Sequence, residues 1–241
     1  MNIFLIINAI IIFWCLSKVM SYIVKQFIVD KNYFFYQNQK FSLIWLLISV
    51  KRVISNKVNS QSIILFILSC IAYAVSKFYL HESHFSSLLE GILIILIASS
   101  CIMDLKTMSI DAKLSYVVVF VLILNFLFLK SLDINKLYCT MGLLVFFGLI
   151  IFIIEKIKGK IVIGGADIDF FIGMIIYFSY QQELYFIIFA GFLGILTKII
   201  LQYINKTSKN KSEFPFLPAI SVAFYFIRLL PINHTSIFNV F

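Results

Sequence analysis

The sequence has 241 residues, of which 62% are hydrophobic and 13% are charged, and its mean hydropathy is +1.03. A water-soluble domain carries about twice that charged fraction, and a soluble chain of this composition would expose enough apolar surface to aggregate. The net charge of +9 would suggest nucleic-acid binding in a soluble protein, but here it favours basic loops that orient a membrane protein.

Eight apolar segments follow one another along the chain, and a membrane-spanning helix needs about 20 such residues. They lie at roughly 3–23, 61–80, 86–103, 114–130, 137–154, 168–180, 184–203 and 217–231. The first is interpreted as a retained span, because it has neither a basic start nor a small-residue cleavage site. The run FSLIWLLISV at 41–50 is too short to span and predicts an interfacial helix. The predicted fold class is an all-α, polytopic membrane helix bundle that forms a single domain over residues 1–241.

Lysine and arginine are unevenly distributed among the predicted loops. Loops 24–60, 104–113, 155–167 and 204–216 together carry 14 of them, whereas the alternate loops carry 2. Because basic loops stay in the cytoplasm, this asymmetry predicts that the four basic loops are cytoplasmic and that both termini lie on the other side.

The cysteines are scattered. Cys15, Cys70, Cys101 and Cys139 include no CxxC pair, so neither a disulfide framework nor a zinc site is indicated. The sequence therefore predicts no metal centre.

Two acids stand at the ends of apolar runs on the predicted cytoplasmic side. Asp104 directly follows GILIILIASSCIM, and Asp167 follows KIVIGGA and opens the sixth segment. Ionisable groups at membrane depth are costly, and they usually have a function. The alternative is that each acid only marks a helix end, and Asp167 is also well placed to interact with the N-terminus of its helix.

Two carboxyl groups on one membrane face suggest peptide hydrolysis. An ionised carboxylate can take a proton from water while a protonated partner hydrogen-bonds the scissile carbonyl, since like charges held close together do not both ionise. The same two acids could instead bind protons or cations in a non-enzymatic transporter or channel.

Three segments resemble the motifs of the type IV prepilin peptidase family. They are MDLKTMSIDAKL at 103–114, which resembles the first active-site motif, IGGADIDFFIGM at 163–174, which resembles the GxGD motif, and EFPFLPAISVAF at 213–224, which resembles the start of the last helix. They occur in the family's order and on one predicted face. The resemblance implies that Asp104 and Asp167 are catalytic aspartates and that residues 86–241 form the peptidase core, with residues 1–85 as an N-terminal part.

The implied activity is that of an aspartic endopeptidase in the bacterial cytoplasmic (inner) membrane, with its active site facing the cytoplasm. Its partners would be type IV prepilin or pseudopilin precursors, whose basic leader it would remove, besides membrane lipid and with no nucleic acid. Proteolysis of this kind needs no cofactor. S-adenosylmethionine would be required only if the enzyme also methylates the new N-terminus.

The chain departs from the family pattern at several positions. Ala166 replaces the second glycine of GxGD, no proline precedes Asp111, and Asp169 stands where many members carry lysine. The first loop also lacks the paired CxxC motifs of many bacterial members, which leaves methylation open and makes an inactive relative a further alternative.

Four residues near the motifs are candidates for substrate binding. Gly164, Gly165 and Ala166 would let a substrate backbone approach Asp167, although a turn needing small residues explains them equally well. Asp111 would contact a basic leader, unless it is a solvated loop acid. The sequence does not indicate the oligomeric state.

Overall fold

The computed structural model describes residues 3–29, 59–107, 109–110, 112–129, 134–159, 164–178, 180–204 and 215–230. Within these residues it contains helices and no strand, which confirms the predicted all-α class. Each predicted apolar segment corresponds to one α-helix. The helices are α1 (Ile3–Val29), α4 (Ser60–Ala74), α5 (His84–Thr107), α6 (Ala112–Leu129), α7 (Ile134–Lys158), α8 (Gly165–Tyr177), α9 (Tyr180–Ile204) and α10 (Leu217–Leu229), and a π-helical turn, η1 (Val75–Tyr79), continues α4. The predicted interfacial helix at 41–50 lies outside the described residues, and the single domain stays a prediction.

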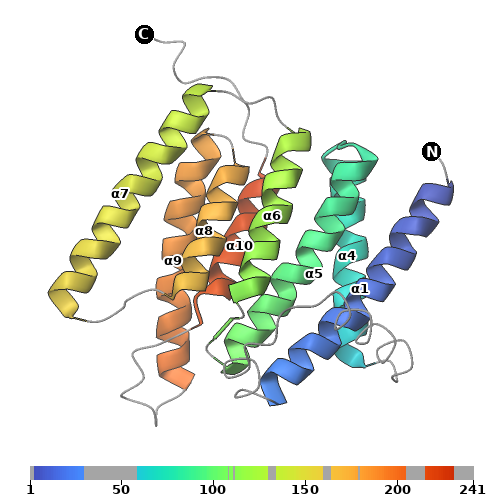
Figure 1. Cartoon of the computed structure of the whole chain (residues 1–241), viewed down its shortest axis with the longest axis horizontal. Coiled ribbons are helices and arrows are strands. Elements are labelled where there is room, and N and C mark those ends of the chain that lie inside the picture. Colours follow the sequence, from blue (N-terminus) through green and yellow to red (C-terminus); the bar gives the residue numbers. More distant parts are fainter. Residues whose placement is uncertain are drawn as a thin grey trace.

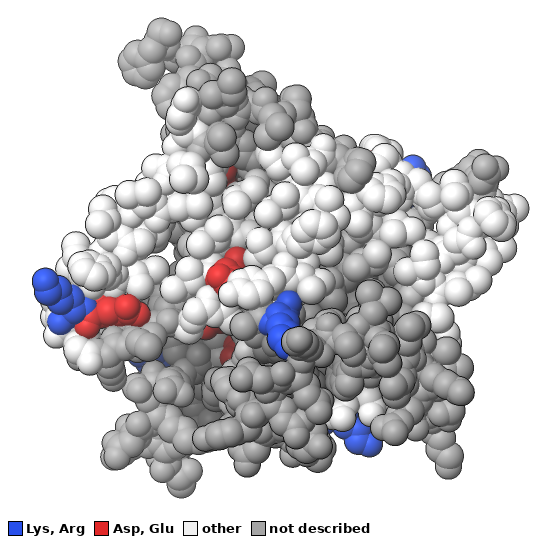
Figure 2. Space-filling view, in the orientation of Figure 1, with Lys and Arg blue, Asp and Glu red and all other residues white. Residues whose placement is uncertain are grey.

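Five of the described helical segments are long and apolar enough to cross a membrane. They lie at Ile3–Ile28, Ser60–Tyr79, His84–Thr107, Thr140–Ile157 and Gln182–Ile200. The described part of the face in Figure 2 is largely uncharged, as contact with lipid requires. The chain is therefore a multi-pass membrane protein.

The helices α8 and α10 are shorter, with 13 residues each. At 1.5 Å per residue such a helix is about 20 Å long, whereas the hydrocarbon core of a membrane is about 30 Å thick. The two predicted segments at 168–180 and 217–231 are thus helices that do not cross the hydrocarbon core alone. At least one end of each lies at membrane depth or is continued by non-helical chain.

The helices stand side by side, with α7 at one edge and α1 at the other (Figure 1). Among the described helices, α5 has the most neighbours, since it packs against α1, α4, η1, α6 and α10. The C-terminal end of α5 and the N-terminal ends of α8 and α10 lie at the same side of the bundle (Figure 1). That side carries both conspicuous aspartates, as their places in the sequence predict.

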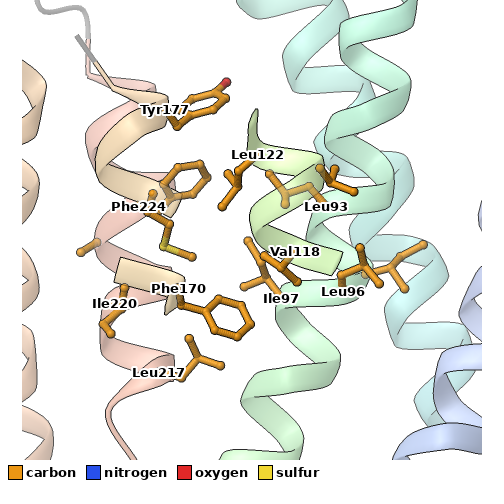
Figure 3. Close-up of a cluster of buried hydrophobic side chains, with 14 of the residues drawn as sticks. Leu93, Leu96, Ile97, Val118, Leu122, Phe170, Tyr177, Leu217, Ile220 and Phe224 are labelled. Carbon is orange, nitrogen blue, oxygen red and sulfur yellow. The ribbon is translucent and has the colours of Figure 1, made fainter. Parts of the chain in front are cut away.

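A buried hydrophobic cluster fills the space between α5, α6, α8 and α10 (Figure 3). Its members include Leu93, Leu96 and Ile97 from α5, Val118 and Leu122 from α6, Phe170 and Tyr177 from α8, and Leu217, Ile220 and Phe224 from α10. Lipid tails are as apolar as these side chains, so close packing holds helices together in a membrane more than the hydrophobic effect does. This packing holds the four helices that surround the two aspartates.

A polar cluster lies at the opposite end of α5. The Arg228 Nη2 atom is 2.9 Å from Glu82 Oε1, and the guanidinium also pairs with Glu90. Asn125 Nδ2 donates to Glu90 at 3.4 Å, and Ser86 Oγ donates to Glu82 at 2.9 Å. We call Arg228, Glu82, Glu90, Ser86 and Asn125 the arginine cluster. It joins α5, α6 and α10 through ion pairs and hydrogen bonds between largely buried groups.

Candidate active site

The two conspicuous aspartates come from different helices. Asp104 lies in the last turn of α5, and Asp167 lies in the first turn of α8. Both α5 and α8 pack against α6 and against α10. The relative position of the two acids therefore depends on two further helices, whose sequences carry no acid at this end.

The Asp104 carboxylate is 5% exposed and accepts a hydrogen bond from a backbone group of α10. The donor is the N–H of Leu217, 3.2 Å from Asp104 Oδ2. Leu217 is the first residue of α10, and the N-cap residue Phe216 provides no side-chain cap. The first amides of a helix have no partner within it, and they form the positive end of its dipole. Asp104 thus caps α10 from a neighbouring helix.

The Asp167 carboxylate folds back over the residue that precedes its helix. Gly164 is the N-cap of α8, and a Cβ atom built on it would be 3.1 Å from Asp167 Oδ2. A side chain at position 164 would therefore displace the carboxylate. Asp167 Oδ1 is buried and has no hydrogen-bond partner among the described residues. Such a buried acceptor is free to interact with a water or a substrate.

The two carboxyl groups lie close enough for their charges to interact. Cys101, one turn before Asp104 on α5, interacts with both acids, and its sulfur is 3.3 Å from Ser221 Oγ. Neither aspartate forms an ion pair within the part of the chain that the structure describes. The structure thus brings close together two acids from distant sequence positions, and no cation of the described residues neutralises them, which is an arrangement suited to proton transfer.

The other predicted residues lie around Asp167 or outside the described chain. Gly164 and Gly165 are exposed, and Ala166 is half-buried, at the start of α8. Asp111 is outside the described residues. Asp169 accepts a hydrogen bond from Ser115 Oγ of α6 at 3.1 Å. The role of the first four in substrate binding stays a prediction, as does the absence of a metal.

Sequence reasoning did not identify the Leu217 amide, Ser115 or the Cys101–Ser221 contact. The segment EFPFLPAISVAF marked the start of the last helix, and Pro218 indicated a helix N-terminus there. No pattern in the sequence, however, shows which side chain approaches that N-terminus.

Comparison with known proteins gives one match. The model of the type IV leader peptidase family matches residues 91–199, a segment that includes α5 from Gly91, all of α6 to α8, and most of α9. No curated protein and no solved structure matches the chain. The matched segment contains both Asp104 and Asp167. Residues 91–199 are therefore similar to the type IV leader peptidase family.

Proposed function

We propose that this protein is an aspartic endopeptidase that removes the basic leader from type IV prepilin-like precursors, with Asp104 and Asp167 as its catalytic pair. The observation that carries the proposal is that two carboxyl groups at one end of the bundle, within the segment that matches the family, lie close enough for their charges to interact, with no ion pair to either among the described residues. The match to the family supports the substrate class, and the interaction between the two carboxyl groups supports the choice of Asp104 and Asp167.

The proposed reaction uses the pair as one unit that holds a single proton. The ionised carboxylate takes a proton from a water molecule, whose oxygen attacks the scissile carbonyl carbon. The protonated carboxyl hydrogen-bonds the carbonyl oxygen and stabilises the charge that develops there. The proton taken from water then passes to the leaving nitrogen as the C–N bond breaks. The Leu217 N–H holds the Asp104 carboxylate in one orientation throughout.

We place this site at the cytoplasmic face of a bacterial inner membrane. The 14 basic residues of the loops on that side support the orientation, because basic loops remain in the cytoplasm. The precursor would present its basic leader to the site from the cytoplasm and its apolar segment from the membrane. Prepilins of type IV pili and pseudopilins of type II secretion both have this form. Methylation of the new N-terminus from S-adenosylmethionine would be a separate reaction, to which we assign no residue.

The orientation can be tested in intact cells. We expect cysteines introduced at positions 106 and 209, in a variant without the native cysteines, to react with a membrane-impermeant thiol reagent only after permeabilisation. Labelling of either position before permeabilisation would contradict the proposed orientation.

The test of activity is cleavage of a leader-bearing prepilin by protein purified in detergent. We expect the wild type to form mature pilin and the Asp104→Asn and Asp167→Asn variants to form none at equal protein concentration. Asp169→Asn is the matched control, because it changes an acid of the same helix turn that lies outside the pair. Proteoliposomes that show Asp104-dependent ion flux without cleavage would support a transporter and overturn the proposal.

A further inference from the structure

The helices α6 and α8 pack against each other along a line of contacts, which we call the seam. Successive contacts in the seam are one helical turn apart on both helices. Ser115 Oγ of α6 donates a 3.1 Å hydrogen bond to Asp169 Oδ2 of α8. One turn further along both helices, Gly173 faces Val119, and a Cβ on Gly173 would lie 3.2 Å from Val119 Cγ2. The same Cβ would lie 3.0 Å from Leu122 Cδ1. The two helices therefore run in the same direction, with a fixed register.

This register decides how deep the first turn of α8 lies. Moving α8 by one residue along α6 would shift it by about 1.5 Å, and it would separate Ser115 from Asp169. The absence of a side chain at Gly173 lets the two helices approach closely. Apolar contacts alone, however, would let α8 slide a short distance along α6. The hydroxyl–carboxylate bond is directional, and Ser115 is fully buried, so the bond selects one register.

Asp167 depends on this register more than Asp104 does. The Leu217 N–H holds Asp104 directly, whereas Asp167 Oδ1 has no hydrogen-bond partner among the described residues. The position of Asp167 is therefore set by the backbone of α8. Asp169 lies two residues further along in the same turn, on a face that meets α6.

We infer that Asp169 is a positioning residue that, through its hydrogen bond with Ser115, sets the place of Asp167 opposite Asp104. The inference rests on the proposed function and adds a residue to it. The resemblance to prepilin peptidases leads one to expect lysine at this position, so this bond is a feature of the present chain.

The kinetic test removes the bond from either side and compares these variants with one that keeps it. Asp169→Leu and Ser115→Ala are each expected to lower kcat about tenfold and to leave KM within about twofold, because misplacement of a reacting group slows the chemical step. The double variant is expected to be no slower than either single one, since both remove the same contact. Asp169→Asn keeps an oxygen that accepts the Ser115 hydrogen, so its kcat should stay within about twofold of the wild type.

A matched control tests whether any interhelical hydroxyl–carboxylate bond has this effect. Thr140 Oγ1 of α7 donates to Glu183 Oε1 of α9 at 2.7 Å, away from the catalytic pair. Thr140→Val should leave kcat unchanged. A tenfold loss in this control, or full activity in Asp169→Leu, would overturn the inference.

A second measurement does not depend on cleavage. Asp167→Cys is prepared in a variant whose native cysteines are replaced by serine, and the rate of its reaction with a water-soluble maleimide is measured. Adding Asp169→Leu is expected to change this rate at least about threefold, and adding Asp169→Asn should leave it unchanged. Equal rates in all three proteins would overturn the positioning role. If the rates change while no precursor is cleaved by the wild type, the proposed function fails and the positioning role stands.

Discussion

The helix α5 carries buried acids near both of its ends, and the groups that surround the acids differ between the two ends. Glu90, with Glu82 before the helix, pairs with the guanidinium of Arg228. About 20 Å away along the helix, Asp104 lies close enough to Asp167 for their charges to interact, and it accepts a hydrogen bond from a single backbone amide. Both pairs of acids are largely buried, yet within the described chain only the first has a cation.

This difference separates an acid pair that holds the bundle together from one that is available for chemistry. A buried charge that is neutralised and hydrogen-bonded is stable in its ionised form and has little tendency to exchange a proton. A buried acid pair without a cation lowers the stability of the fold. Such pairs are retained where a functional site uses them. The helix α10 contacts both clusters, through Leu217 at its start and Arg228 near its end, so it links the two acid clusters of α5.

The largest effect is expected from neutralising Asp104 or Asp167, the pair for which the described residues provide no cation. Asp104→Asn and Asp167→Asn should each lower the rate of prepilin cleavage by at least about a thousandfold, because asparagine can neither take nor share the proton. The double variant should be little slower than the single ones, since the pair acts as a unit. Rates are measured as mature pilin formed over time, with each variant matched for membrane abundance. Near-normal cleavage by either single variant would end the proposed role of the pair.

The arginine cluster should respond in stability instead. Arg228→Met leaves Glu82 and Glu90 buried without their cation, and breaking a buried ion pair from one side costs about 3–5 kcal/mol. The free energy of unfolding in mixed micelles measures this loss. Combining Arg228→Met with Glu82→Gln and Glu90→Gln should recover most of it, because the uncompensated charges are gone. If the Arg228→Met protein were as stable as the wild type, the contrast between the two acid pairs would not hold.

The sequence predicted the helices well, and it singled out two acids that the structure brings close together, but it did not predict how they are held. Each helix follows from an apolar run in the sequence, and this pattern is local. Asp104 and Asp167 were recognisable because an acid that borders an apolar run is unusual. Contacts such as Leu217 to Asp104, or Ser115 to Asp169, join residues 113 and 54 positions apart. They depend on helix register, which one sequence does not reveal.

Arg228 is another residue whose partners cannot be predicted from one sequence. It is one of the two arginines in the chain, and it lies inside the last apolar segment. That position could have marked it as a buried charge with an acidic partner. The partner Glu82, however, lies in a short loop far away in the sequence, where it reads as a solvated residue.

A smaller effect is expected at Gly164, where the absence of a side chain leaves room for the Asp167 carboxylate. Gly164→Ala places a methyl group 3.1 Å from the present position of Asp167 Oδ2, so the carboxylate must move. We expect kcat to fall about tenfold with unchanged stability, because a shift of a reacting group by a fraction of an ångström affects the chemical step more than binding. Gly165→Ala is the control, since a Cβ there meets nothing within 4 Å. Equal activity of the two variants would show that Asp167 does not depend on the space over Gly164.

The smallest effect is expected at Gly173, although the contact there is as tight. A Cβ on Gly173 would lie 3.0 Å from Leu122 Cδ1, the end of a flexible side chain that can rotate, and 3.2 Å from Val119 Cγ2, where a shift of a few tenths of an ångström is enough. At Gly164, by contrast, the atom that must move is the carboxylate oxygen of Asp167 itself. Gly173→Ala should therefore lower kcat only about twofold and cost about 1 kcal/mol of stability, as mild overpacking does. Comparing Gly173→Ala with Gly164→Ala distinguishes the effect of moving the helix α8 from the effect of moving the Asp167 carboxylate itself. A tenfold loss of kcat in Gly173→Ala would mean that the seam between α6 and α8 has no freedom to adjust.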